Sequence, residues 1–110
     1  MAEPTLQQVF GANAVQDDTT ITITKSDLVS VGLTASSTNR AEALFAAILL
    51  KAKTSLTSDN QTSNADQSIT IANGFVPSYT VRDAIQYRQD DITVSLQKPA
   101  GSLALDPDDY

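Results

Sequence analysis

Carboxylates are the only common acid–base groups in this 110-residue sequence, which has thirteen acidic residues but no histidine and no cysteine. Without those two residue types, the usual general base, the usual nucleophile and most zinc ligands are missing. Two carboxylates held across a cleft can still hydrolyse glycosides. The acids fall mainly in predicted loops, as solvated turn residues do: Asp17, Asp18, Asp59, Asp66, Asp83, Asp90 and Asp91. We therefore predict no catalytic residue, no cofactor and no enzymatic activity.

The acidic C-terminus is the place where calcium binding has to be weighed, because calcium takes oxygen ligands from loops. Asp106, Asp108 and Asp109 lie close together in the sequence. No turn glycine wraps the backbone around an ion there, and no segment has the EF-hand spacing. The four glycines stand alone, so the sequence has no phosphate-binding or dinucleotide-binding loop either. We predict solvated carboxylates and no metal site.

Three tyrosines are candidate recognition residues. Tyr79 and Tyr87 fall in predicted strands, which favours a place at the rim of the core with a hydrated hydroxyl group. Tyr110 differs, because an aromatic residue at the end of an acidic tail has no core to pack in. We predict that Tyr110 anchors the tail in a neighbouring protein.

The charge of the chain narrows the class of partner. The formal net charge is −6 and the pI is about 4.2. Nucleic acids and anionic membranes both require clustered Lys and Arg, whereas the seven basic residues here are scattered. The start of the chain does not resemble a signal peptide, and the longest apolar run, residues 43–50, is shorter than the roughly 20 residues that span a bilayer. We expect a soluble protein that binds neither nucleic acid nor membrane.

A long amphipathic helix, predicted over residues 39–56, has to supply most of the core. Its apolar residues recur at the i, i+3, i+4 spacing that places them on one face. They are Ala41, Leu44, Phe45, Ile48, Leu49, Ala52 and Leu56. Asn39 followed by Glu42 is typical of a capping box and predicts the start of this helix.

The opposite face of the same helix carries small or uncharged residues, where a solvated face would carry Glu, Lys and Gln. Alanine is also simply the best helix former, so this composition alone has an ordinary explanation. Leu50 favours a second contact surface, on this chain or on a neighbour. The candidate contact residues on this face are Ala43, Ala47 and Leu50.

Shorter elements precede the helix. Pro4 and Gly11 bound a predicted short N-terminal helix, because proline suits a first turn and glycine an end. The alternation over residues 19–24 predicts a strand with one buried face. A brief turn over residues 28–31 is closed by Gly32.

The segment after the helix predicts an antiparallel sheet. Residues 57–67 are turn and loop formers, and residues 68–72 alternate as a strand does. The dipeptide 73–74, Asn-Gly, predicts a hairpin turn, with residues 75–81 as the returning strand. Arg82-Asp83 is a second candidate turn.

A change of parity marks the last strands. Ile85 and Tyr87 alternate on one parity, whereas Ile92, Val94 and Leu96 alternate on the other. A strand cannot change faces without an inserted residue, so residues 89–91 predict either a bulge or a tight turn.

Together these elements predict an α+β fold in one domain, residues 1–110. One long amphipathic helix packs on an antiparallel sheet of about four strands. Residues 1–18 form an N-terminal arm with a short helix, and residues 98–110 form an extended C-terminal tail.

Two classes of function agree with these features. A structural assembly subunit would use irregular terminal arms and the Ala-rich helix face to contact neighbours, including other copies of itself in a homo-oligomer. An acidic binding or inhibitor module would use the net charge of −6 to mask a basic partner.

Four stretches carry a resemblance to a known group of proteins: residues 1–11, residues 23–28 with 32–34, residues 41–50, and residues 106–110. In these stretches the chain resembles small proteins encoded by cyanobacteria and their tailed viruses. The resemblance spans most of the chain but contains no catalytic motif.

The resemblance implies a virion structural protein of a cyanophage-like tailed phage or prophage, made in the host cytoplasm and incorporated into the particle. A capsid cement (decoration) protein that binds the major capsid protein is the role we favour, and a small tail, neck or baseplate component is the alternative. Apolar residues near the termini would enter grooves on neighbouring subunits: Leu6, Val9, Phe10, Leu103, Leu105 and Tyr110.

Overall fold

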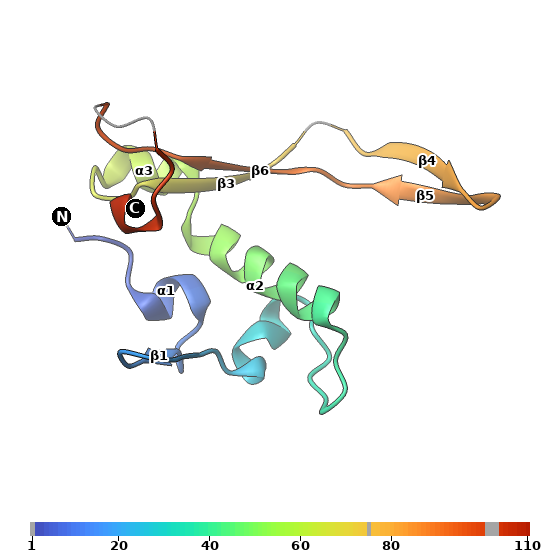
Figure 1. The fold of residues 1–110 in the computed structure, drawn as a ribbon, viewed down its shortest axis with the longest axis horizontal. Coiled ribbons are helices and arrows are strands. Elements are labelled where there is room, and N and C mark those ends of the chain that lie inside the picture. The colour runs from blue at the N-terminus through green and yellow to red at the C-terminus, as the bar shows by residue number, and fades with distance from the viewer. Residues whose placement is uncertain (1, 75, 101–103) are drawn as a thin grey trace.

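The predicted α+β class is confirmed by the computed structural model, which describes residues 2–74, 76–100 and 104–110. A central helix crosses beneath a long antiparallel ribbon, with the smaller N-terminal elements on the far side of the helix (Figure 1). In chain order the elements are α1 (Leu6–Phe10), β1 (Val15–Gln16), β2 (Ile21–Thr22), the 3-10 helix η1 (Lys25–Val31), α2 (Ala41–Ser55), α3 (Ser58–Ser63), β3 (Ile69–Asn73), β4 (Ser78–Arg82), β5 (Ile85–Gln89), β6 (Ile92–Leu96) and the 3-10 helix η2 (Pro107–Asp109).

The strands form three antiparallel pairs instead of one continuous sheet: β1 with β2, β3 with β6, and β4 with β5. In Figure 1, β4 continues the line of β3, and β6 continues the line of β5. The last four strands therefore make one long ribbon. We call the β3–β6 pair the base ribbon and the β4–β5 pair, residues 78–89, the arm.

The hairpin turn predicted at Asn73-Gly74 is wrong. Asn73 is the last residue of β3 and pairs with Ile92, and the chain then runs on into β4. The ribbon reverses at Asp83-Ala84, beside the second candidate turn, and both residues have positive φ angles of 51° and 63°. Two-residue hairpin loops need positive φ angles to match the strand twist, and here the pairing of Arg82 with Ile85 imposes them.

The parity change at residues 89–91 lies at the joint between base ribbon and arm and not at a turn, because β5 leads into β6 along the same edge of the ribbon. Four residues separate Asn73 from Ser78, whereas two separate Gln89 from Ile92, so the register changes between base ribbon and arm. At this joint the Gly74 amide donates to the Asp91 carbonyl at 2.7 Å. A Cβ atom at position 74 would lie 2.8 Å from that carbonyl oxygen, which explains the glycine.

The core lies where the C-terminal half of α2 meets the base ribbon. Ala52, Leu56 and Ile71 are buried there, and Leu49 and Ile69 pack against them. The N-terminal half of α2 extends beyond this core, so the predicted apolar stripe is buried along only part of its length. Phe45, which the periodicity places in the stripe, is 71% exposed.

The predicted capping box at the start of α2 is wrong. Arg40 is the N-cap residue and makes no side-chain cap. The Asn39 side chain instead holds the preceding loop, accepting from the Ser36 amide at 3.0 Å and donating to the Thr34 carbonyl at 2.9 Å. Six residues of the segment expected to be loop form α3, whose first turn is capped by Thr57.

The N-terminal helix and the turn closed by Gly32 are confirmed. Thr5 and Gln8 form a capping box on α1, and Gly11 ends it with a φ of 120°. Gly32 ends η1 in the left-handed region. The strand predicted over residues 19–24 shrinks to β2, and its Ile21 is 52% exposed, because only the short β1 pairs with it.

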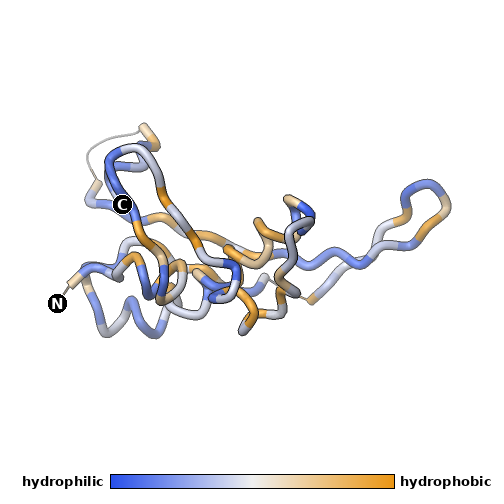
Figure 2. Tube along the Cα trace, turned by 90° about the horizontal axis from the view of Figure 1, so that it is seen from below, coloured by the Kyte–Doolittle hydropathy of each residue, from blue (hydrophilic) through white to orange (hydrophobic). Residues whose placement is uncertain are grey.

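Both ends of the chain are held against the domain. The Asn64 side chain donates to the Ala2 carbonyl at 2.8 Å, which fixes the N-terminal segment. Lys98 pairs with Asp109 at 2.9 Å and donates to the Ala104 carbonyl, which brings the C-terminal tail back. The two termini lie at the end of the molecule opposite the tip of the arm (Figures 1 and 2).

Candidate interaction surface

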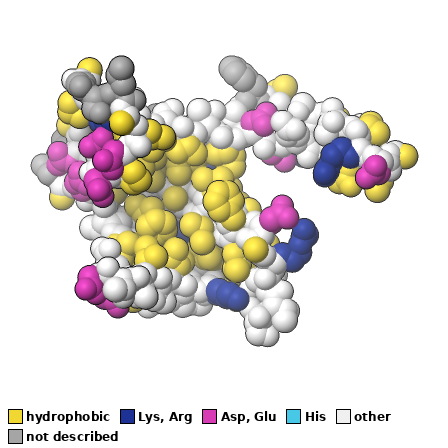
Figure 3. Space-filling view, viewed as in Figure 1, with side chains coloured by type: hydrophobic (Ala, Val, Ile, Leu, Met, Phe, Trp, Pro, Cys, Tyr) yellow, Lys and Arg dark blue, Asp and Glu magenta, His cyan; other side chains and the backbone are white. Residues whose placement is uncertain are grey.

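The arm is the most exposed ordered element of the described structure. Every residue of β4 and β5 is exposed, although its sequence is as rich in β-branched and aromatic residues as that of the base ribbon. The exposed fractions of its large apolar side chains are 65% for Tyr79, 68% for Val81, 55% for Ile85 and 37% for Tyr87. In Figure 3 the arm stands away from the body of the molecule.

Both faces of the arm carry apolar side chains. Directly paired residues share a face, so Tyr79 and Val81 lie on one face with Arg88 and Gln86, their partners. Tyr87 and Ile85 lie on the other face, opposite Thr80 and Arg82. The Arg82 guanidinium also stacks 4.2 Å above the centre of the Tyr87 ring. An arm with two apolar faces suits a site in which both faces are covered.

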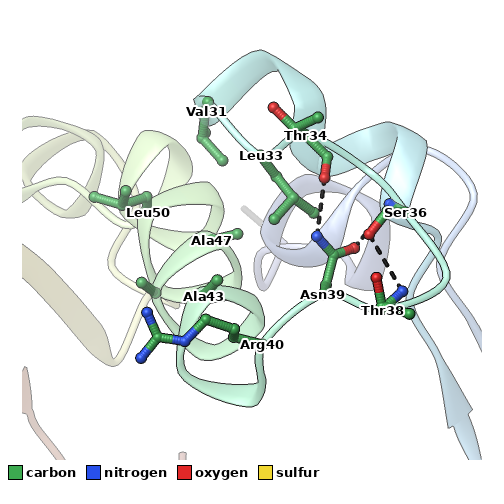
Figure 4. Close-up of a pocket in the computed structure, with 12 residues that line it drawn as sticks. Val31, Leu33, Thr34, Ser36, Thr38, Asn39, Arg40, Ala43, Ala47 and Leu50 are labelled. Carbon is green, nitrogen blue, oxygen red and sulfur yellow. Dashed lines mark hydrogen bonds between the residues drawn. The ribbon is translucent and has the colours of Figure 1, made fainter.

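A groove follows the face of α2 that we predicted as a second contact surface. Figure 4 shows Ala43, Ala47 and Leu50 on one wall, facing Val31 and Leu33 from η1 and the following segment. The groove has a volume of about 510 Å³ and is open to solvent. Its floor is apolar, and the hydrogen bonds of Asn39 fix the loop at one end.

The predicted second contact surface is therefore partly used within the chain. Ala47 is buried, with an exposed fraction of 5%, whereas Ala43 is exposed and Leu50 is half-buried. η1 covers part of the face, and the rest stays open along the groove.

A second groove continues the first toward the arm. Ala46 and Leu50 line both grooves, and the second adds Leu49 from α2. Its opposite wall is the joint between base ribbon and arm, including Pro77 and Ile92. Its volume is about 620 Å³. The two grooves meet at Ala46 and Leu50, and together we call them the α2 trough. Its wall on α2 is apolar from Ala43 to Leu50, while the opposite wall of the second groove also carries Arg88, Asp90 and Asp91.

The candidate contact residues near the termini gather at the other end of the molecule. Val9 and Phe10 line a shallow pocket together with Tyr110 of the same chain, and all three are half-buried. Leu6 is half-buried in α1, next to them in sequence. Tyr110 thus has a place on its own domain, which differs from the expectation of a free anchor.

The apolar residues of the C-terminal tail behave differently from Tyr110. Leu105 is 76% exposed. Leu103 lies outside the described residues.

The molecule exposes much more surface than a compact chain of its size. Its accessible surface is 8159 Å², whereas a compact monomer of 11.7 kDa exposes about 5,900 Å². Its radius of gyration is 16.3 Å, against about 13 Å for a compact domain of this length. Hydrophobic side chains gather in a broad patch on the face of the body seen in Figure 3. Both the arm and the body therefore leave apolar area uncovered.

Asp17 is the carboxylate whose environment departs most from the ordinary. Hydrogen bonds from the Thr19 and Thr20 amides, and then from their hydroxyl groups, lower the pKa of Asp17 to about 2. The side chain is exposed and closes the β1–β2 loop. Its shifted pKa has a structural cause and points to no reaction.

In the part of the chain that the structure describes, no three His, Cys, Asp or Glu side chains come together in a way that would hold a metal ion. No described helix has the length and apolarity needed to cross a membrane.

The sequence analysis did not predict that the apolar residues of the arm are candidate contact residues. Tyr79 and Tyr87 were expected at the rim of the core, and the structure places them far from it. The error follows from the misplaced turn. Centring the hairpin on Asp83-Ala84 would have paired Tyr79 with Arg88 and Tyr87 with Thr80, which gives the two apolar faces from sequence alone.

No protein-family model, curated protein or solved structure matches this chain.

Proposed function

We propose that this chain is a non-enzymatic structural subunit of a virion, a capsid cement (decoration) protein of a cyanophage-like tailed phage that binds neighbouring shell subunits. The observation that carries the structural role is the arm, a two-stranded ribbon with exposed apolar side chains on both faces. The virion setting rests on the sequence resemblance.

An isolated two-stranded ribbon is marginally stable in water and gains stability when another layer packs on it. The base ribbon has such a layer in α2, whereas the arm has none among the residues that the structure describes. A protein that keeps an unsupported apolar arm has a use for it in an assembly, where a neighbour covers the arm.

The surface area supports the same role. A standard stable interface removes about 800 Å² from each partner. The excess of this chain over a compact monomer is about 2,300 Å², enough for more than one such interface. Binding more than one neighbour is what a protein that cements a shell has to do.

Counting copies of the chain in purified virions tests the proposal, with quantitative mass spectrometry against the major capsid protein. We expect on the order of hundreds of copies per particle, because a closed symmetric shell repeats each of its contacts many times. A count of a few copies to a few tens would overturn the cement role in favour of the neck, tail or baseplate. Absence from virions would overturn the structural role and favour the acidic binding module.

A further inference from the structure

The arm and the α2 trough are neighbours within one chain. Pro77, Arg88 and Asp90, at the root of the arm, form one wall of the trough. The trough runs about 10 Å from Ala43 to Leu50, at 1.5 Å per helical residue. A five-residue strand extends about 17 Å, so an arm is long enough to cross the trough.

One chain thus presents both a projecting apolar element and an open apolar site. If a two-fold axis passes beside the root of the arm, each copy places its arm on the α2 trough of the other, and the same contact forms twice. Isologous interfaces use the same patch on each copy in this way. An arm placed there would contact α2 of the other copy with one face and leave its second face toward the other arm.

The distribution of charge allows the arm of one copy to approach the body of another. Residues 78–89 contain two arginines and one aspartate, a net charge of +1, so the other residues of the chain carry −7. The arm of one copy is therefore attracted to the body of another, although the two whole chains repel each other. Arg82 is exposed near the tip of the arm. At the trough the side chain of Asp91 is exposed, whereas the carboxylate of Asp90 is already paired with Arg88 at 3.0 Å.

The area is also sufficient. Two reciprocal contacts need about 800 Å² on each copy for a standard interface, and the chain exposes about 2,300 Å² beyond a compact monomer. The four large apolar side chains of the arm, Tyr79, Val81, Ile85 and Tyr87, all stay exposed on this chain.

From these observations we infer that the arm binds a second copy of this chain. The protein forms a two-fold dimer in which the arm of each copy lies across the α2 trough of the other. This inference rests on the proposed function and deepens it, because it names the first partner of the arm within the assembly.

Sedimentation equilibrium of the purified full chain measures the dimer directly. We expect a mass twice the 11.7 kDa of the monomer. Val81→Asp on the arm and Ala46→Arg in the trough should each raise the dissociation constant about 30-fold or more, since each puts an unpaired charge in the centre of the contact. Thr93→Asp, on the exposed outer face of the base ribbon, is the matched control and should leave the mass unchanged.

Mixing the two weakened variants tests reciprocity. A heterodimer of Val81→Asp with Ala46→Arg has one unaltered arm–trough contact and one in which the two new charges are opposite. We therefore expect the mixture to recover the dimer mass that neither variant reaches alone. Circular dichroism of each variant checks that the fold is kept, which the exposure of both positions predicts.

The inference is overturned if the unaltered chain is monomeric, if Val81→Asp dimerises as well as the unaltered chain, or if the mixture stays monomeric. A mass above that of a dimer would also overturn it, because it indicates head-to-tail exchange. These results are independent of the copy number in virions. A monomer abundant in virions would refute the dimer alone, and a dimer missing from virions would refute the proposed function alone.

Discussion

The base ribbon and the arm are two halves of one hairpin with opposite environments. Each half is a pair of five-residue strands, rich in β-branched and aromatic residues. In the base ribbon, Ile69 and Ile71 share a face with Ile92 and turn toward α2, while the other face carries small and polar residues. In the arm both faces carry large apolar side chains beside polar ones, and both faces are exposed.

The difference between the halves shows that the pairing of two strands does not by itself bury their apolar side chains. The two halves make the same kind of antiparallel ladder, so local pairing energy does not distinguish them. The base ribbon is stabilised because α2 covers part of its single apolar face, which buries Ile71 and leaves Val94 and Leu96 exposed. The unequal joint between the halves, with four residues on one strand and two on the other, ends that arrangement, and the arm continues beyond the reach of α2 (Figure 1).

The largest contrast is expected from truncating one aliphatic side chain in each half. Ile71→Ala removes a buried side chain, 5% exposed, and should cost about 2–5 kcal/mol of unfolding free energy through lost burial and a cavity. Val81→Ala, at a position 68% exposed, should change it by less than about 0.5 kcal/mol. Urea unfolding of dilute protein measures both. Equal losses would mean that the arm belongs to the monomer core.

A smaller contrast is expected from truncating one glutamine beside the base ribbon and one in the arm. Gln67, just before β3, is 4% exposed and donates to the carbonyls of Thr57 and Ile69, each at 2.9 Å. Gln67→Ala leaves these carbonyls without that donor and should cost about 1–3 kcal/mol in urea unfolding. Gln86→Ala in the arm is the control and should stay within about 0.5 kcal/mol, because Gln86 is exposed. A neutral Gln67→Ala would show that water replaces the lost donor.

The turn of the arm allows the comparison to be sharpened without touching the core. Ala84 has a φ of 63°, which costs a residue with a Cβ atom about 1–2 kcal/mol relative to glycine. Ala84→Gly should slow amide hydrogen exchange in the arm several-fold and leave exchange in the base ribbon unchanged. Slower exchange in both halves would instead mean that the arm and the base ribbon open together.

The smallest effect is expected at the β1–β2 loop, which a charged side chain closes. Hydrogen bonds from Thr19 and Thr20 lower the pKa of Asp17 from 3.8 to about 2, so the ionised form stabilises the loop. That stabilisation is complete above about pH 3.8 and is lost as the pH falls through about 2. The amide protons of Thr19 and Thr20 should follow this titration in NMR spectra.

A variant at this loop supplies the control. Asp17→Ala should abolish the titration of both amides, while Asp18→Ala should leave it in place. Titration that persists in Asp17→Ala would assign it to another group.

Elements with strong local signals were predicted correctly. Capping residues and periodicity predict four elements that the structure contains: the N-terminal helix ending at Gly11, the turn ending at Gly32, strand β3 and the main part of α2. The interruption of the ladder at residues 89–91 follows from the parity of apolar residues. These signals act between residues close in the chain, so the sequence states them directly.

Elements whose choice depends on distant residues were predicted wrongly. Asn73-Gly74 is a favourable turn, yet Gly74 instead lies opposite Asp91, where its lack of a Cβ atom permits the close ribbon contact. Asn39 is a favourable cap, yet its side chain bonds Thr34 and Ser36. In both cases a contact with another part of the chain decides the residue's role, although its local preference predicts a different one.

The sequence by itself determined that the chain forms a small α+β domain, where the central helix lies and which residues are able to form strands. Only the tertiary structure decided which apolar residues the domain buries. Periodicity states that Phe45, Tyr79 and Val81 lie on apolar faces, but burial also requires a second surface within reach. The C-terminal half of α2 meets that surface in the base ribbon, and the arm does not meet one in the described part of the chain.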